Sequence, residues 1–197
     1  MRSTRSIFLL SLLTAIGLAG CGDDPGSPGW TEVATGTLTA SQSAQATRAA
    51  AARDVLVKRL MSKLAAALEA GGPPAAVEVC QSIAPAEAAA ASKETGVRVG
   101  RTSHKLRNPA NAPPAWTKPF VAARAAEQRF AAHEDGRLGV LFPIRLQKRC
   151  LACHGPADAL AEGVGEAIAK HYPDDAATGF KQGDLRGWFW VEVPAGE

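Results

Sequence analysis

The sequence predicts an α+β fold in which a long helix comes first and strands follow in the second half of the chain. Between Thr39 and Ala70 there is neither Pro nor Gly, and Ala is abundant. Leucines recur there at every fourth position, which places them on one stripe of a helix: Leu56, Leu60, Leu64 and Leu68. Helices come first and strand-like runs are mixed with helices after them, an order typical of the α+β class.

Two interruptions are expected in the helical part of the chain. The Gly-Gly-Pro-Pro run at 71–74 ends the first helix sharply. The next helix begins at Pro74, carries Cys80 and breaks near Pro85. A short third helix then stops before Gly96.

The second half of the chain is expected to supply the sheet. His104–Pro114 holds three Pro and two Asn and is predicted to be a loop, and Ala115–His133 reads as another helix. The runs with the apolar or alternating pattern of strands are Val97–Val99, Leu138–Ile144 and Leu185–Val193.

Length and composition point to one domain of 197 residues in which large apolar side chains are scarce. Hydrophobic residues make up 46%, but Phe 6, Trp 4 and Tyr 1 are few, so a bulky apolar cofactor would help to fill the core. The formal net charge is +3, and Arg2 and Arg5 lie in a segment that is expected to be removed. The remaining chain is close to neutral, which argues against a nucleic-acid partner.

The N-terminus has the features of a lipoprotein signal peptide over residues 1–20. Two arginines precede Ile7–Leu18, an apolar run of about a dozen residues that is short for a membrane span. Leu18-Ala19-Gly20-Cys21 then resembles the lipobox of bacterial lipoproteins, which implies lipid on Cys21. An ordinary signal peptide that ends near a Cys is the alternative. Residues 21–38 are read as a lipidated tether and 39–197 as the folded domain.

This resemblance also sets the expected location. The chain is predicted to be a membrane-anchored protein of the cell envelope that faces the periplasm, with the lipid bilayer as a partner. Gly22, rather than Asp, follows Cys21, which by the sorting pattern of such lipoproteins favours the outer over the inner membrane. The apolar run at the N-terminus is the one hydrophobic stretch near membrane length, so a polytopic membrane protein is excluded.

Cys150-Leu151-Ala152-Cys153-His154 has the C-x-x-C-H pattern of c-type haem attachment. Both thiols add to haem vinyl groups as thioethers, and the adjacent His ligates the iron. A thioredoxin-like redox pair is one alternative, but the alternation of strands and helices around it is absent. A zinc site is another, but it needs a second pair of ligands at similar spacing. The sequence therefore predicts one covalently attached haem c.

The second axial ligand is less directly indicated. Cys80 is the cysteine left over once two thiols go to haem and one to lipid, and iron ligation is one role for it. An inert buried thiol is the alternative. The competing candidates for the sixth position are Met61, His104, His133 and His171.

The position of the motif excludes two familiar classes of haem protein. Small electron-carrier cytochromes c carry the motif early and use a Met downstream of it, whereas no Met follows Met61 here. Cytochromes c′ carry it on the last helix of a four-helix bundle, whereas here the strand candidate Leu185–Val193 follows it.

Five ordered segments resemble a bacterial family of single-haem c-type domains of unknown function. The segments are Cys80–Pro85, Gly100–Ser103, Arg107–Pro113, Cys150–Gly155 and Tyr172–Phe180, with Gly183–Gly187 after the last. The resemblance implies a PAS-like antiparallel sheet flanked by helices. It also implies that Cys80 and His154 are the two axial ligands of the iron. His104 departs from the family pattern, which more often has an apolar residue there.

The predicted function is that of a redox or diatomic-gas sensor, because a His/Cys-ligated iron favours the ferric state. Such a sensor would act through an unknown redox or signalling partner. An electron-transfer cytochrome c of an envelope redox chain is the alternative. The chain is not predicted to be an enzyme, since a peroxidase needs an open iron face with a distal acid–base group. Arg101, Arg107 and Arg186 are candidates for holding the haem propionates, and solvated or purely structural arginines are the equal alternative.

Overall fold

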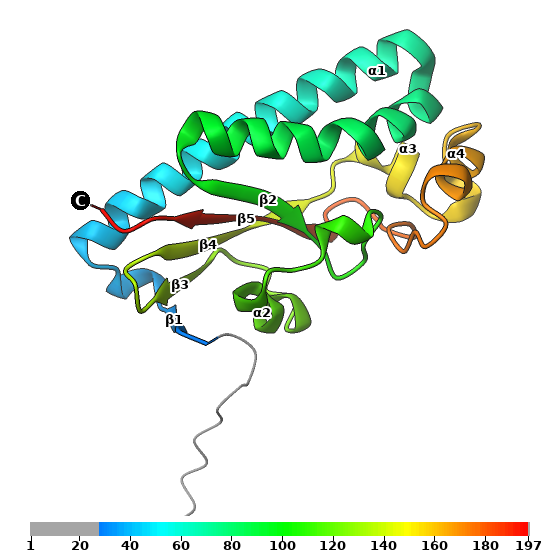
Figure 1. The fold of residues 1–197 in the computed structure, drawn as a ribbon. Coiled ribbons are helices and arrows are strands. Elements are labelled where there is room, and N and C mark those ends of the chain that lie inside the picture. Colours follow the sequence, from blue (N-terminus) through cyan, green and yellow to red (C-terminus); the bar gives the residue numbers. More distant parts are fainter. Residues whose placement is uncertain (1–27, 197) are drawn as a thin grey trace, which may run out of the picture.

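The core of the protein is a five-stranded antiparallel sheet in the order β1-β3-β4-β5-β2 (Figure 1). This computed structural model describes residues 28–196. The strands are β1 (Trp30–Val33), β2 (Arg98–Thr102), β3 (Arg129–His133), β4 (Leu138–Arg145) and β5 (Leu185–Val193). The predicted α+β class with an antiparallel sheet and a long preceding helix is confirmed. β5 has the predicted bounds, while β2 and β4 extend past theirs at the C-terminal end.

Helix α1 (Ala40–Thr95) is a helical hairpin that folds back on itself at Gly71 and Gly72. Both glycines have non-helical backbone angles, and Gly72 has φ +68°, a conformation that favours glycine. The first arm, residues 40–70, starts at a capping box formed by Thr39 and Gln42. The second arm, residues 73–95, starts with two prolines, which lack the N–H groups that a first helical turn leaves unpaired.

The break predicted near Pro85 is wrong, because the second arm runs without interruption to Gly96. Pro85 is exposed, so the carbonyl that loses its helical partner there can bond to water. Ala84 and Ala91, on another side of the arm, are buried, and this tertiary packing supports the helix past Pro85. Arg59 of the first arm joins the two arms through ion pairs with Glu87 and Glu94 at 3.1 Å and 2.6 Å.

The helix predicted for Ala115–His133 is also wrong over most of its length. Only α2 (Lys118–Ala122) is helical, preceded by a 3₁₀ turn, and Arg129–His133 is strand β3. β3 pairs with β1 on one side and β4 on the other. These ladders outweigh the helical preference of a short Ala-containing segment, since propensity is a weak determinant beside tertiary contacts.

The folded domain begins earlier than residue 39, the boundary expected from the sequence. Trp30–Val33, within the predicted tether 21–38, forms edge strand β1. Trp30 stacks on Trp116 with ring centroids 5.3 Å apart. The predicted signal peptide 1–20 and Cys21 lie outside the described residues.

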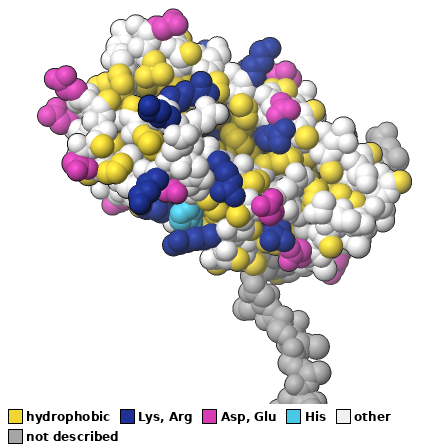
Figure 2. Space-filling view, turned by 180° about the vertical axis from the view of Figure 1, so that it is seen from behind, with side chains coloured by type: hydrophobic (Ala, Val, Ile, Leu, Met, Phe, Trp, Pro, Cys, Tyr) yellow, Lys and Arg dark blue, Asp and Glu magenta, His cyan; other side chains and the backbone are white. Residues whose placement is uncertain are grey.

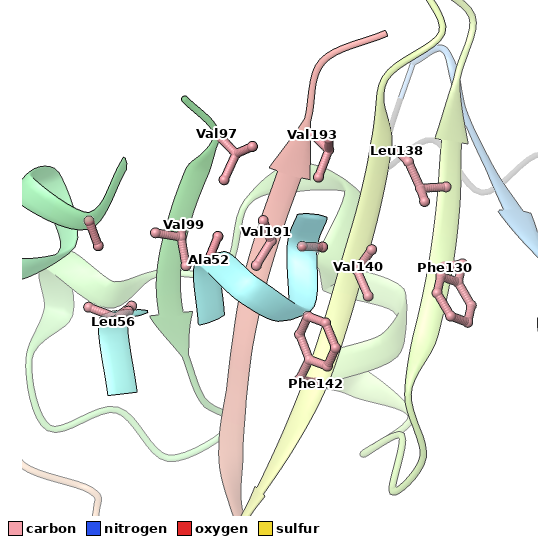
Figure 3. Close-up of a cluster of buried hydrophobic side chains, with 12 residues drawn as sticks. Ala52, Leu56, Val97, Val99, Phe130, Leu138, Val140, Phe142, Val191 and Val193 are labelled. Atoms are coloured by element: carbon pink, nitrogen blue, oxygen red, sulfur yellow. The ribbon is translucent and has the colours of Figure 1, made fainter. Parts of the chain in front are cut away.

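Each face of the sheet is covered by a separate apolar cluster. The first arm of α1 covers one face, where Ala52 and Leu56 meet valines of the sheet (Figure 3). On the other face, Trp116 and Phe120 cover Trp188 and Leu141. Trp188 is fully buried in this cluster.

Two short helices follow β4 and lie next to the hairpin end of α1 (Figure 1). They are α3 (Leu151–His154) and α4 (Val164–His171). Val77 of the second arm packs with Val164 and Ile168 of α4, and Cys153 packs against this group. In the part of the chain from 28 to 196, no helix combines the length and the apolar character needed to cross a membrane.

Candidate functional site

A cavity of about 340 Å³ lies between α1, the loop after β2 and the segment that joins β4 to α3. This volume is within the range of small-molecule and cofactor sites. Cys80, Cys150, Cys153 and His154 all line it, so the structure brings together every predicted cofactor-binding residue. Three of them belong to the C-x-x-C-H motif, whereas Cys80 lies 70 residues before Cys150 and no local pattern joins it to the motif.

The C-x-x-C-H segment is a 3₁₀ turn, Lys148–Cys150, that continues into α3. In this turn geometry, residues three or four apart lie on the same side, so the two thiols and the imidazole can all reach the cavity. Cys150 and Cys153 are free, half-buried thiols. Burial raises the pKa of the Cys153 thiol.

His154 is held as a neutral imidazole with one ring nitrogen in use. Its Nδ1 lies 2.8 Å from the carbonyl oxygen of Ala177, and it donates a hydrogen bond to this oxygen when the proton is on Nδ1. Burial, together with the charges of Arg186 and Arg107, lowers the pKa of His154 to about 3. The Nε2 lone pair is therefore available, and metal-ligating His side chains typically donate their other ring N–H to a carbonyl or carboxylate oxygen.

Cys80 reaches the cavity from the second arm of α1. Burial raises the pKa of its thiol, and the charges of Arg101 and Arg107 act in the opposite direction. A thiol flanked by two guanidinium groups is suited to ionise when a metal ion binds it, since both cations favour the thiolate.

The rival candidates for the second axial position differ in whether they line the cavity. Met61 lines the cavity and is 40% exposed. The three histidines are not among the lining residues. His104 packs against Phe180 and Trp188, His133 contacts Asp135 and Trp30, and His171 contacts Gln81.

The three candidate arginines all line the cavity, but they differ in their partners. Arg107 forms an ion pair with Asp175 at 2.9 Å. Arg186 donates to the Ser103 hydroxyl and to the Lys105 carbonyl, and burial lowers the pKa of its guanidinium to about 10. Burial also lowers the pKa of Arg101. Within residues 28–196 neither Arg101 nor Arg186 pairs with a carboxylate, so the cavity wall offers two cations to an anionic ligand.

The opposite wall is apolar and comes from the leucine stripe that the sequence showed. Leu56 belongs to the sheet core, Leu60 packs against that core and also lines the cavity, and Leu64 and Leu68 line the cavity. Leu68 is 41% exposed. Hydrophobic and basic side chains also lie next to one another on the rear face of the molecule (Figure 2).

Sequence reasoning missed two polar residues of the site. Tyr172 lines the cavity, and burial raises the pKa of its hydroxyl to about 12. Asp175 pairs with Arg107 and accepts a hydrogen bond from the Ala177 N–H at 3.1 Å. Both lie in the segment Tyr172–Phe180, which the family resemblance included without assigning a role to any residue.

A metal centre built from side chains alone is not seen in the described part of the chain. No group of three or more His, Cys, Asp or Glu side chains is placed there to hold a metal ion. A structural zinc site requires four ligands of this kind. A haem needs fewer protein ligands, because the macrocycle supplies the equatorial donors.

The fold and the site together define a class: an α+β domain whose cavity, lined by thiols, an imidazole and guanidinium groups, suits a cofactor. The model of the Tll0287-like family matches residues 32–194, and the chain belongs to this family. Among solved structures, the chain is similar to the cyanobacterial heme-protein Tll0287, with 27% sequence identity and a TM-score of 0.56. That match covers 77% of this chain and 95% of the other. No curated protein matches the chain.

Proposed function

We propose that the chain binds one haem c, attached covalently through Cys150 and Cys153 and ligated by His154 and Cys80. The observation that carries the proposal is that these four residues line one cavity. Membership of the Tll0287-like family and similarity to a protein described as a heme-protein support it.

The two walls of the cavity fit the two sides of this cofactor. Haem has a broad apolar body and two carboxylates. The leucine wall would pack against the body, and Arg101 and Arg186 are free to pair with the carboxylates. Arg107 is the weakest candidate for this role, because Asp175 already occupies its guanidinium.

The proposed role is that of a redox or diatomic-gas sensor. A thiolate ligand favours ferric iron, so reduction should weaken the bond to Cys80 and open a coordination position. The location of Cys80 on a helical arm, with Arg101 beside its thiol, would couple this release to a structural element. An electron-transfer role is the second candidate, and it requires both ligands to remain bound in both oxidation states.

An enzymatic role such as a peroxidase is less well supported. His104, the side chain that would serve as a distal acid–base group, packs between Phe180 and Trp188 and does not line the cavity. We therefore retain the proposal that the chain is not an enzyme.

We also propose that Cys21 carries lipid and anchors the chain in the cell envelope, with the domain facing the periplasm. This rests on the sequence of residues 1–21. Export would place the chain in the compartment where haem c is attached and where a signalling or redox partner could reach it.

One set of measurements on the purified full chain tests the haem proposal. Haem staining after denaturing electrophoresis reports covalent attachment, and the absorption spectrum of the ferric protein reports thiolate ligation. Adding CO to the reduced protein then separates the two roles. A sensor should bind CO as Cys80 leaves, whereas a carrier should keep its spectrum. Absence of haem stain from protein made with the c-type maturation system would refute the proposed function.

A further inference from the structure

A buried ion pair lies directly behind His154 and shares its hydrogen-bond partner. Arg107 Nε donates to Asp175 Oδ1 at 2.9 Å. Arg107 Nη2 donates to the carbonyl oxygens of Cys153 at 2.7 Å and Ala177 at 3.3 Å. The Ala177 carbonyl is also the acceptor for His154 Nδ1. The side chains of Arg107 and Asp175 are only 11% and 6% exposed.

This network joins three separate segments. Arg107 lies in the loop after β2, Cys153 and His154 lie on α3, and Asp175 and Ala177 lie in the loop after α4. A buried ion pair contributes little net stability compared with apolar packing, so its place beside a ligand needs another explanation.

We propose that Arg107 and Asp175 are positioning residues that set the electron-donor strength of His154 through the shared carbonyl of Ala177. The inference rests on the proposed ligation of iron by His154. A hydrogen bond from Nδ1 to a strong acceptor raises the basicity of a ligating imidazole. The Arg107 cation draws electron density from the same carbonyl and weakens it as an acceptor. Asp175 limits this effect, because it holds the guanidinium and neutralises its charge.

The signs of two substitutions follow from this arrangement. Asp175→Asn leaves the Arg107 charge uncompensated next to His154. The uncompensated cation destabilises the ferric state by charge repulsion, and it also weakens the imidazole as an electron donor to the iron. Both effects should raise the reduction potential. Changing a partner that orients a metal-ligating His typically alters metal affinity or activity by about 10-fold or more. A tenfold change in the relative stability of the two oxidation states is a shift of about 59 mV for one electron.

The double variant Arg107→Met with Asp175→Leu should shift the potential the other way. It leaves the net charge unchanged, because one cation and one anion are lost together. The Ala177 carbonyl then keeps His154 as its donor without competition from the guanidinium, which strengthens the imidazole and lowers the potential. Apolar replacement of both members of a buried pair is generally tolerated by the fold.

The test is a redox titration of the haem-loaded full chain, with the ferric spectrum checked for an unchanged ligand set. Asp174→Asn is the matched control, since Asp174 is the neighbouring carboxylate and is exposed. We expect a rise for Asp175→Asn, a fall for the double variant and no change for the control.

An unchanged potential in Asp175→Asn would overturn the inference. A shift of the same sign in both variants would also overturn it, because that is the result expected if the substitutions merely loosen the site, whatever charge they remove. Should Asp175→Asn fail to mature, the double variant decides alone, and a fall is required. Loss of covalent haem from both would mark the pair as purely structural and equally overturn it. Failure of the proposed function is distinguishable, since the wild type itself would then lack covalent haem or a His-ligated spectrum.

Discussion

Replacement of Cys80 by Ser tests the axial ligand on which the sensor proposal depends. Serine is nearly isosteric with cysteine and stays neutral at ordinary pH, so the second arm of α1 and the cavity should keep their form. Covalent haem should also persist, because Cys150 and Cys153 are untouched. The substitution removes the negative charge of the thiolate ligand from the iron.

The size of the effect can be worked from that charge. A unit charge acting at roughly 4 Å through an effective dielectric of about 20 is worth about 4 kcal/mol. This energy changes the equilibrium constant between ferric and ferrous iron by nearly three factors of ten, which is a rise in potential of roughly 180 mV. Arg101 and Arg107 are present in both proteins, so their charges do not add to this shift. The expected result is a rise of this order and a ferric iron that becomes high-spin.

Spectroscopy and redox titration of the purified variant provide the assay, with Met61→Leu as the matched control. Met61 is the other sulfur-bearing rival that lines the cavity, and its replacement should change neither spectrum nor potential. His104 should not capture the iron in the Ser variant, because it packs outside the cavity. If Cys80→Ser has the ferric spectrum and potential of the wild type, Cys80 is not a ligand and the sensor proposal fails with it.

Three further outcomes are expected. Replacing Cys150 and Cys153 together by Ala should abolish covalent haem, as judged by haem staining, and a stained double variant would contradict the motif assignment. Leu56→Ala should lower the free energy of unfolding by about 2–5 kcal/mol in denaturant titrations, because Leu56 is fully buried in the sheet core. Leu60→Ala should cost the haem-free protein clearly less, because Leu60 is only partly buried between the core and the cavity. Equal losses in the two variants would refute this difference in burial. Cys21→Ala should release the protein from the membrane fraction or leave it uncleaved, and a wild-type chain of unlipidated intact mass would rule out the anchor.

The parts of this protein that depend on neighbouring residues were predictable from sequence. The C-x-x-C-H motif is such a part, because the distance between two thiols three positions apart is set by the local backbone. Strands β4 and β5 are also of this kind, since their apolar and aromatic runs have no competing signal. The hairpin turn in α1 follows from two glycines and two prolines in succession.

Other elements were decided by pairing between distant segments. Arg129–His133 becomes a strand because β1 and β4 offer hydrogen bonds on both of its sides, a fact that no window of local sequence contains. Pro85 remains inside a helix because it is exposed to solvent while Ala84 and Ala91 on another side of the arm are packed. The cost of proline in a helix is then offset by tertiary packing, which local sequence does not contain.

The same division applies to the candidate site. The sequence by itself determined the thiols and the imidazole of the motif, and through the family resemblance it pointed to Cys80. Tertiary structure alone decided that Leu56 is fully buried in the core while Leu60 lies partly buried between the core and the cavity, although both belong to one stripe. It also decided that Arg107 is held by Asp175, 68 residues away, while Arg101 and Arg186 are left without a carboxylate partner in the described chain. The physical reason is that charge pairing and burial depend on which segments meet in space, and this is a property of the whole fold.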